Sequence, residues 1–267
     1  GLFMVHIPMR TKNPMRTPDL VRINQPGRKH TLQMLLQPAD RRNSSTPPVP
    51  ARNAPPPASV RGTPPPMPVV RRSHPPVTGT ILQKGQKISL SRLEPNLDIL
   101  EVGLGWDLAP GGQSYDLDAE AFLLGPSGMV LGDDWFVFYN QPVSPDGAVR
   151  LLTADASGAG HEDGEVLRVC LRQVNPNIAK IAFILTINEA RTYGYHFGNV
   201  ANAYVRLVSQ STHRELVRFQ LTDYYSNVCS MVVGELYRYN SEWRFNPVGN
   251  GTGDDLAGLC TQYGVNT

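Results

Sequence analysis

The amino-acid sequence predicts a mainly β protein, a β-sandwich with one short helix near the C-terminus, preceded by an extended proline-rich arm. Three observations lead to this fold class. Short runs rich in β-branched and aromatic residues follow one another from residue 81 onward. Turn signals such as GPSG, SPDG and NPN separate these runs. Proline and positive charge, by contrast, are concentrated before residue 81.

The two parts of the chain differ in charge. Residues 1–80 contain 12 Lys and Arg against 2 Asp and Glu, a net charge of +10, and 17 of the 24 prolines. Residues 81–267 contain 13 Lys and Arg against 21 Asp and Glu, a net charge of −8. Stretches such as TPPVP and TPPPMP favour polyproline II and cannot build a hydrophobic core. We therefore expect residues 1–80 to form a basic arm and residues 81–267 to form one acidic domain, which is large enough to bury a full core.

Ten runs of the acidic domain are predicted to be strands. The run KIAFILTI at 180–187 is apolar on both faces and is expected to be a central strand. A helix is predicted within residues 252–265, with Thr252 or Asp254 as its N-cap and Gly264 near its end. The ten runs are residues 86–92, 97–106, 116–124, 135–141, 165–174, 180–187, 203–209, 216–222, 234–240 and 242–248.

Acidic residues gather at the predicted strand ends and in glycine-containing loops. In an extended strand Asp116, Asp118 and Glu120 point to one face, and three adjacent carboxylates are unfavourable there without a cation. Hard oxygen donors on flexible loops suit Ca²⁺, which takes about six to eight of them. The same clustering adds as candidate ligands Asp107, Asp133, Asp134, Asn140 and the carboxylates of the loop TADASGAGHEDGE, which are Asp155, Glu162, Asp163 and Glu165.

Other chemistries find less support in the sequence. Counting from Asp155, position 12 of an EF-hand falls on Val166, and strand-like runs flank the loop where helices are needed. The histidines and cysteines lack the spacing of a zinc site, and no G-x-S-x-G or P-loop motif occurs. We therefore expect that the protein is not an enzyme. A carboxylate-based hydrolase is the minor alternative, because paired carboxylates can also cleave glycosidic bonds.

The cysteines and the apolar runs bear on the compartment. Cys170, Cys229 and Cys260 lie far apart and are odd in number, which predicts reduced, buried thiols. The apolar runs are shorter than a membrane span. The apolar stretch within the first ten residues is also too short for the hydrophobic region of a signal sequence. We expect a cytoplasmic protein.

Seven segments of the acidic domain occur in a distinctive order, namely GLGWD, YDLDAEAFLL, DDWFVFYNQ, VNPNIAKIAFILTI, FGNVANAYVRLV, GELYRYNSEWRF and LAGLCTQYGV. This order resembles that of the TerD family of tellurium-resistance and stress-response proteins, and the resemblance covers about residues 81–267. It implies a β-sandwich that binds one or two Ca²⁺ ions through acidic loops, has no established catalytic activity and is linked to resistance to tellurite, other chemical stress, phage and colicins.

Carried over residue by residue, the resemblance implies Ca²⁺ ligands in three segments. His161 and Gly164 stand where family members usually carry acids, and the acidic loop is one residue shorter, which puts the second ion in question. The implied ligand positions are Asp116 and Asp118 in the acidic strand, Asp133 and Asp134 before FVFYN, and Asp155, Gly158, Gly160, Asp163 and Glu165 in the loop.

The arm is not part of the family's usual domain, so its role rests on its composition. Its arginines recur roughly every ten residues, or near 30 Å in polyproline II, and the acidic domain supplies carboxylates for them. We expect the arm to tether the chain to other copies or other protein subunits. This would also suit a structural subunit of a large assembly, such as a filament or a virus-like particle. Nucleic acid is the competing partner, although Phe3 is the arm's only aromatic residue.

Overall fold

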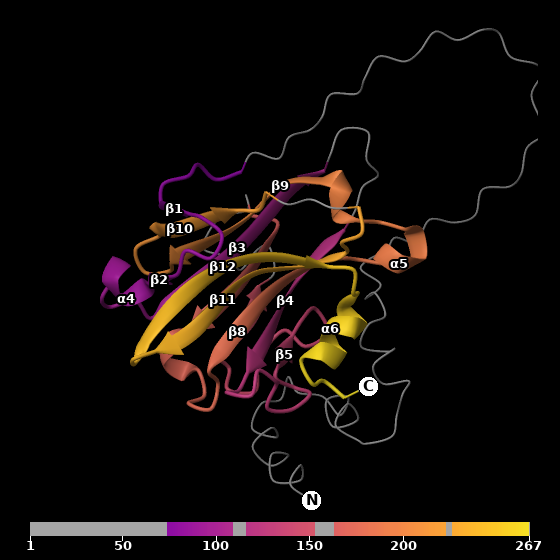
Figure 1. The fold of residues 1–267 in the computed structure, drawn as a ribbon. Helices are drawn as coiled ribbons and strands as arrows, with labels where there is room; N and C mark the ends of the chain where they lie inside the picture. Colours follow the sequence, from indigo (N-terminus) through magenta and orange to yellow (C-terminus); the bar gives the residue numbers. More distant parts are fainter. Residues whose placement is uncertain (1–73, 109–115, 153–162, 223–225, 267) are drawn as a thin grey trace, which may run out of the picture.

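A computed structural model contains two six-stranded β-sheets packed face to face (Figure 1). It describes residues 74–108, 116–152, 163–222 and 226–266, and the structural statements below concern these residues. Most of the predicted arm therefore lies outside the described residues. Sheet A has the strand order β1-β10-β9-β3-β7-β6, and sheet B has the order β2-β12-β11-β8-β4-β5. The predicted mainly β sandwich with a short C-terminal helix is confirmed.

Neighbouring strands pair antiparallel, except β1 and β10, which are parallel. Sheet A contains β1 (Thr80–Leu82), β3 (Ile99–Leu108), β6 (Val149–Leu152), β7 (Glu165–Cys170), β9 (Val200–Ser209) and β10 (Glu215–Gln220). Sheet B contains β2 (Ile88–Ser89), β4 (Leu117–Leu124), β5 (Phe136–Val137), β8 (Lys180–Ile187), β11 (Ser230–Tyr239) and β12 (Glu242–Thr252). The helices are α4 (Leu90–Leu93), α5 (Ala190–Tyr193) and α6 (Leu256–Gln262), with 3₁₀ turns η3 (Leu171–Gln173) and η4 (Phe197–Asn199).

The main hydrophobic core lies between the two sheets, and the alternation of side chains along the strands builds it. In β4, Leu117, Ala119 and Ala121 face this core, as their spacing predicts. In β8, Phe183 faces the same core while Ile184 is buried on the opposite side of the sheet. The prediction of a central strand with two apolar faces is thus confirmed. Each fully buried large apolar side chain contributes about 1.5–3 kcal/mol to folding.

A second, smaller core lies on the outer face of sheet B, where α6 covers β4 and β5 (Figure 1). The rings of Phe122, Phe136 and Phe138 stack, with 4.5 Å between successive ring centroids. Leu259 and Cys260 of α6 pack against them. Since a helix of seven residues is too short to be stable alone, this burial is what holds α6 in place.

Three predicted strands are clearly shorter than the sequence runs suggest, and one of them, residues 135–141, forms only β5 (Phe136–Val137). Residues 86–92 form only the two residues of β2 before the chain turns into α4. A single helical turn there brings Leu90 and Leu93, three residues apart, onto the main core. Residues 165–174 form β7 only up to Cys170, and the turn η3 follows.

The C-terminal helix begins at a different residue from the two predicted N-caps. Its N-cap is Asp255, whose Oδ1 accepts a hydrogen bond from the amide of Gly258 at 3.0 Å. The predictions of Thr252 and Asp254 are therefore wrong by one to three positions. The predicted end is confirmed, because Gly264 follows the last turn with a φ of +83°, which glycine adopts without strain.

Replacing Asp255 by alanine is expected to lower the free energy of unfolding by about 1 kcal/mol, because the Gly258 amide loses its acceptor. Equilibrium urea unfolding measures the change. Asp254→Ala is the matched control, since its carboxylate is exposed and makes no capping bond. An equal loss in both variants would contradict the assignment of the cap.

The cysteines are free thiols, as expected. Cys229 and Cys260 are buried, whereas Cys170 is half-buried. Burial raises the pKa of each thiol above its ordinary value, so the thiolate form is disfavoured. As for membranes, the helices formed by the described residues are all too short or too polar to span a bilayer.

Candidate functional site

Strand ends of both sheets meet at one end of the sandwich. Strand β3 ends there beside the start of β9, β4 starts there beside the end of β8, and β7 starts there as well. The amide of Phe197, just before β9, donates to the carbonyl oxygen of Val228, just before β11, at 2.8 Å and joins the two sheets. We call this region the acidic end. It comprises residues 107–108, 116–118, 165, 188–199, 226–229 and 253–255.

Carboxylates dominate the charge of the acidic end. Its described residues include one arginine, Arg191, and no lysine. Arg191 lies 3.3 Å from the carboxylate of Asp255 and offsets only part of the negative charge. The carboxylates are Asp107, Asp116, Asp118, Glu165, Glu189, Asp254 and Asp255. Like charges gathered in this way repel one another, which favours a bound cation.

Glu120 lies next to the acidic end, and its pKa is affected by the carboxylates there. It shares a face of β4 with Asp118, as predicted, but it is only 1 % exposed. Its Oε1 accepts a hydrogen bond from the Thr186 hydroxyl at 2.7 Å, and its Oε2 has no hydrogen-bond partner among the described residues. Burial raises the pKa of Glu120 well above its usual range, and the charges of Asp118 and Glu165 raise it further. Carboxylates of the two sheets therefore act on one another here.

Two predicted ligands are held by side chains of the protein itself. The Asp107 carboxylate lies 2.8 Å from His74 Nε2 through one oxygen and accepts from Asn202 Nδ2 at 2.9 Å through the other. The Asp163 carboxylate accepts from Arg206 through both oxygens, at distances of 2.7–3.0 Å. The side chain of Asp163, although it belongs to the acidic loop in the sequence, is fully buried in this ion pair.

Asp133 and Asp134 lie away from the acidic end, near the opposite end of β4 and the C-terminus of the chain. One oxygen of Asp133 accepts from the amide of Asn266 at 2.8 Å. Burial raises the pKa of Asp133, and the neighbouring Asp134 adds to the rise. Asn140 follows β5, which runs back toward the acidic end in its pairing with β4. The structure thus divides the predicted ligands into two groups rather than one.

The remaining predicted ligands, Asp155, Gly158, Gly160 and Glu162, lie outside the described residues. Within the parts of the chain that the structure describes, no three His, Cys, Asp and Glu side chains are arranged to hold a metal ion. The carboxylate oxygens of the acidic end are nevertheless the donors that Ca²⁺ prefers.

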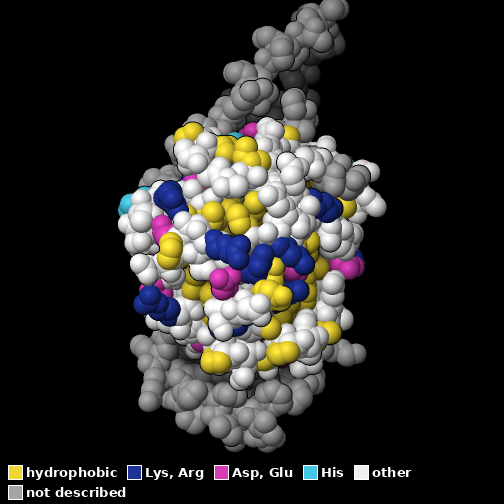
Figure 2. Space-filling view, turned by 60° about the vertical axis from the view of Figure 1, so that its left-hand side comes forward, with side chains coloured by type: hydrophobic (Ala, Val, Ile, Leu, Met, Phe, Trp, Pro, Cys, Tyr) yellow, Lys and Arg dark blue, Asp and Glu magenta, His cyan; other side chains and the backbone are white. Residues whose placement is uncertain are grey.

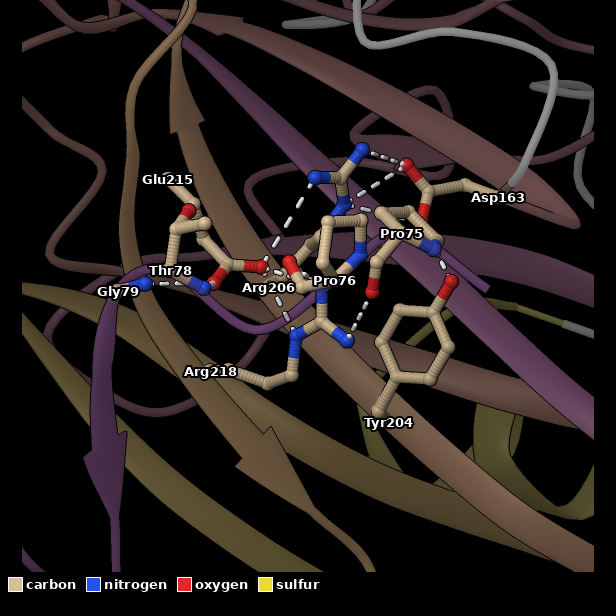
Figure 3. A network of polar contacts seen from close by, with 9 residues as sticks. All are labelled: Pro75, Pro76, Thr78, Gly79, Asp163, Tyr204, Arg206, Glu215 and Arg218. Carbon is tan, nitrogen blue, oxygen red and sulfur yellow. Dashed lines mark hydrogen bonds and ion pairs between the residues drawn. The ribbon is translucent and has the colours of Figure 1, made fainter. Parts of the chain in front are cut away.

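A network of buried charges, not foreseen from the sequence, holds residues 74–79 across the outer face of sheet A (Figure 3). We call these residues, HPPVTG, the anchor segment. Arg218 donates to the carbonyl oxygens of its two prolines at 2.9 and 3.4 Å. Glu215 accepts from the amides of its last two residues, both at 2.7 Å. The network therefore recognises main-chain atoms of the segment that joins the arm to the domain.

Arg206 lies at the centre of this network. It pairs with Asp163 on one side and lies 3.8 Å from Glu215 on the other, and Glu215 also accepts from Arg218 Nε at 2.8 Å. These charged side chains are at most 8 % exposed. Burial lowers the pKa of Arg206, but the bonds with Asp163 outweigh it and the pKa is raised. The Tyr204 hydroxyl donates to Asp163 at 2.6 Å, and burial together with that carboxylate raises the pKa of Tyr204.

Two glycines of β3 make room for the network. A Cβ atom at Gly103 would lie 2.6 Å from Asp163 Oδ2, and a Cβ atom at Gly105 would overlap the ring of Tyr204. Both side chains lie directly over the backbone of β3, which only glycine permits. The GLG of GLGWD is thus explained by the close approach of these two side chains.

The sequence does carry a signal for this network. Arg206 and Arg218 interrupt the apolar runs YVRLV and LVRFQ, and an arginine within an apolar strand is rarely buried unless it is paired. The two runs do not indicate which side chains pair with these arginines. Asp163 and Glu215 come from other strand ends, and only the strand order of sheet A brings them together.

Comparison with known proteins agrees with this fold. The TerD domain family matches residues 79–263. The chain is 43% identical over 186 residues to "Tellurium resistance protein TerD" of Serratia marcescens, which covers 69% of this chain and 97% of that protein. It is 41% identical over 186 residues to "General stress protein 16U" of Bacillus subtilis, covering 69% and 96%.

A solved structure of a homologue of telluride resistance protein (TerD) from Streptomyces coelicolor is 22% identical, with a TM-score of 0.47, and covers 64% of this chain and 99% of that one. The family match and the two sequence relatives decide the assignment. This chain belongs to the TerD domain family, whose members include tellurium-resistance and stress-response proteins.

Proposed function

We propose that this chain is a non-enzymatic, Ca²⁺-binding stress-response protein of the TerD family, whose arm tethers it to partner subunits. The observation that carries the proposal is the acidic end, whose described residues include seven carboxylates but one arginine. Asp116 and Asp118 of sheet B and Glu165 of sheet A would supply the described ligands, with Asp155 and the backbone near Gly158 and Gly160 completing the site. Sharing one cation would hold the strand ends of both sheets together.

Adding Ca²⁺ is expected to raise the melting temperature. A ligand that binds only the folded state stabilises it by about 2.7 kcal/mol at a hundredfold excess over Kd, which is roughly 5–10 °C for a domain of this size. Differential scanning calorimetry with Ca²⁺ and then with a chelator measures the shift. It should be reversible, since the chelator removes the ion.

Asp116→Asn combined with Asp118→Asn is expected to remove most of the Ca²⁺-dependent shift. Asp98→Asn is the matched control, because Asp98 is an exposed carboxylate at the opposite end of the sandwich. A melting temperature that Ca²⁺ does not change in the unsubstituted protein would refute the calcium proposal. So would an equal loss of the shift in the control.

The anchor segment supports the tethering role of the arm. His74 contacts Asp107 of the acidic end. The arm, whose residues 1–73 have a net charge of +10, is therefore joined to the domain beside the acidic end. An arm attached there can reach the carboxylates of a neighbouring copy, and its polyproline II character reduces the entropy lost on binding. Glu215 and Arg218 form hydrogen bonds with main-chain atoms of the segment, so the arm is attached to sheet A at a defined position.

Deleting residues 1–73 is expected to leave a folded, Ca²⁺-responsive chain and to abolish arm-dependent assembly. The deletion stops before the anchor segment, because that segment and β1 belong to sheet A. Sedimentation velocity of the full and shortened chains, with and without nuclease, measures assembly. If the shortened chain assembles as well as the full chain, the arm is not the tether; if nuclease dissolves the assembly, the arm's partner is nucleic acid.

A further inference from the structure

A strip of positive charge runs along the β2 edge of sheet B. Figure 2 brings this side of the molecule forward and shows a band of Lys and Arg side chains with hydrophobic and a few acidic side chains beside it. Lys87 precedes β2, and Arg92 lies in α4; both are exposed. Arg244 of β12 lies directly opposite Ser89 of β2. We call Lys87, Arg92 and Arg244 the basic strip.

The cations of the basic strip have no carboxylate partner within the described chain. The Lys87 ammonium lies 5.9 Å from the ring centroid of Tyr237, and the Arg244 guanidinium lies 5.6 Å from that of Tyr239, which is 54 % exposed. The nearby acids are engaged elsewhere, Glu235 with Lys180 and Glu242 with Ser89. The strip thus offers charge and tyrosine side chains together, a combination enriched at the centres of protein interfaces.

Protection of the sheet edge does not account for the whole strip. Lysines on edge strands prevent unwanted strand pairing, and Lys87 suits that role. Arg244, however, lies one strand further in, where β12 pairs with β2 on one side and with β11 on the other. It has no free edge to protect, and although the domain has a net charge of −8, no described carboxylate pairs with it.

The acidic end of another copy is the complementary surface that this chain itself supplies. It presents seven carboxylates against one arginine, and Glu189 and Asp254 in it are exposed. Single-stranded nucleic acid matches the strip less well. Bases bind such surfaces by stacking on open aromatic rings, whereas cations here lie over the rings of Tyr237 and Tyr239.

We propose that the basic strip docks on the acidic end of a second copy of this chain. The two surfaces differ, so the contact is heterologous and each docked copy leaves a strip and an acidic end free for the next. The strip is a surface of the domain, separate from the arm, and its contact adds to the arm-mediated tethering proposed above. Because Lys87 and Arg92 of the strip are exposed, as are Glu189 and Asp254 of the acidic end, the contact strengthens at low salt and weakens at high salt.

The test is sedimentation velocity of the full-length chain at about 0.05 M and about 0.5 M salt, with nuclease-treated samples. The strip variant is Lys87→Glu with Arg244→Glu, and the end variant is Glu189→Lys with Asp254→Lys. A third protein combines all four substitutions. Arg150→Glu with Arg172→Glu is the control, since these exposed arginines lie elsewhere and give the same change of charge as the strip variant.

We expect the unsubstituted chain to associate at low salt, the strip and end variants to associate about tenfold more weakly, and the control to behave as the unsubstituted chain. The combined variant should regain association, because both surfaces change sign together. Unchanged association of the strip variant, no recovery in the combined variant, or loss of association on nuclease treatment would each overturn the proposal. Asp116 and Asp118 are intact in every variant, so the Ca²⁺ shift tests the proposed function separately.

Discussion

Arg206→Leu is expected to lower the free energy of unfolding by about 3–5 kcal/mol. The substitution removes the guanidinium that donates to both oxygens of Asp163 and leaves that carboxylate buried without its counter-ion. It also removes a positive charge 3.8 Å from Glu215, which holds the anchor segment. Equilibrium urea unfolding should show a lower midpoint with an unchanged slope, since the surface exposed on unfolding stays the same.

Two comparisons separate burial from simple loss of an ion pair. Arg172→Leu removes an exposed arginine 3.8 Å from Asp98 and should cost less than about 1 kcal/mol. Adding Asp163→Leu to Arg206→Leu should recover much of the loss, because no unpaired buried charge remains. The prediction fails if Arg206→Leu costs no more than Arg172→Leu.

Gly105→Ala is expected to destabilise the domain by about 3–4 kcal/mol, although it adds only one methyl group. The new Cβ atom would overlap the Tyr204 ring, and overpacking of this kind costs about 1–3 kcal/mol. Moving the ring away would also break the bond from its hydroxyl to Asp163, and a hydrogen bond to a charged group contributes about 1.5–3 kcal/mol. Thermal and urea unfolding measure the loss.

A double-mutant cycle with Tyr204→Ala checks this cause. Once the ring is removed, the methyl group of Gly105→Ala has space, so the pair should cost clearly less than the sum of the single substitutions. Additive costs would mean that Gly105 serves the backbone of β3 rather than the approach of Tyr204.

Local pattern was enough to predict much of the fold. The period of two in residues 116–124 placed Leu117 and Ala119 on the face opposite the carboxylates, which is the core face of β4, and the unbroken apolar run at 180–187 indicated the central strand β8. Both signals depend on side chains that lie within a few residues of each other. The single helical turn of α4 was missed, because four residues are too few to reveal a helical period.

Long-range packing limited what could be foreseen at the candidate site. Glu120 is buried because α6, from the far end of the chain, covers its face of β4, and the period of the strand carries no trace of that. Asp163 was grouped with the acidic loop by its position in the sequence, yet Arg206 holds it under the anchor segment. The density of acidic residues in the sequence predicts which segments attract cations. Which of those carboxylates are buried or paired with other side chains depends on the order of the strands in the sheets.

The route of the anchor segment has a mechanical consequence. The segment begins at His74, which contacts Asp107, and crosses sheet A to Glu215. It then continues into β1, which runs parallel to β10. A force applied through residue 74 therefore loads its contacts in sequence: first the one with Asp107, then those with Arg218, and last those with Glu215. Because these contacts are loaded one after another and not all at once, we expect the anchor segment to detach from sheet A at a lower force than the sandwich unfolds.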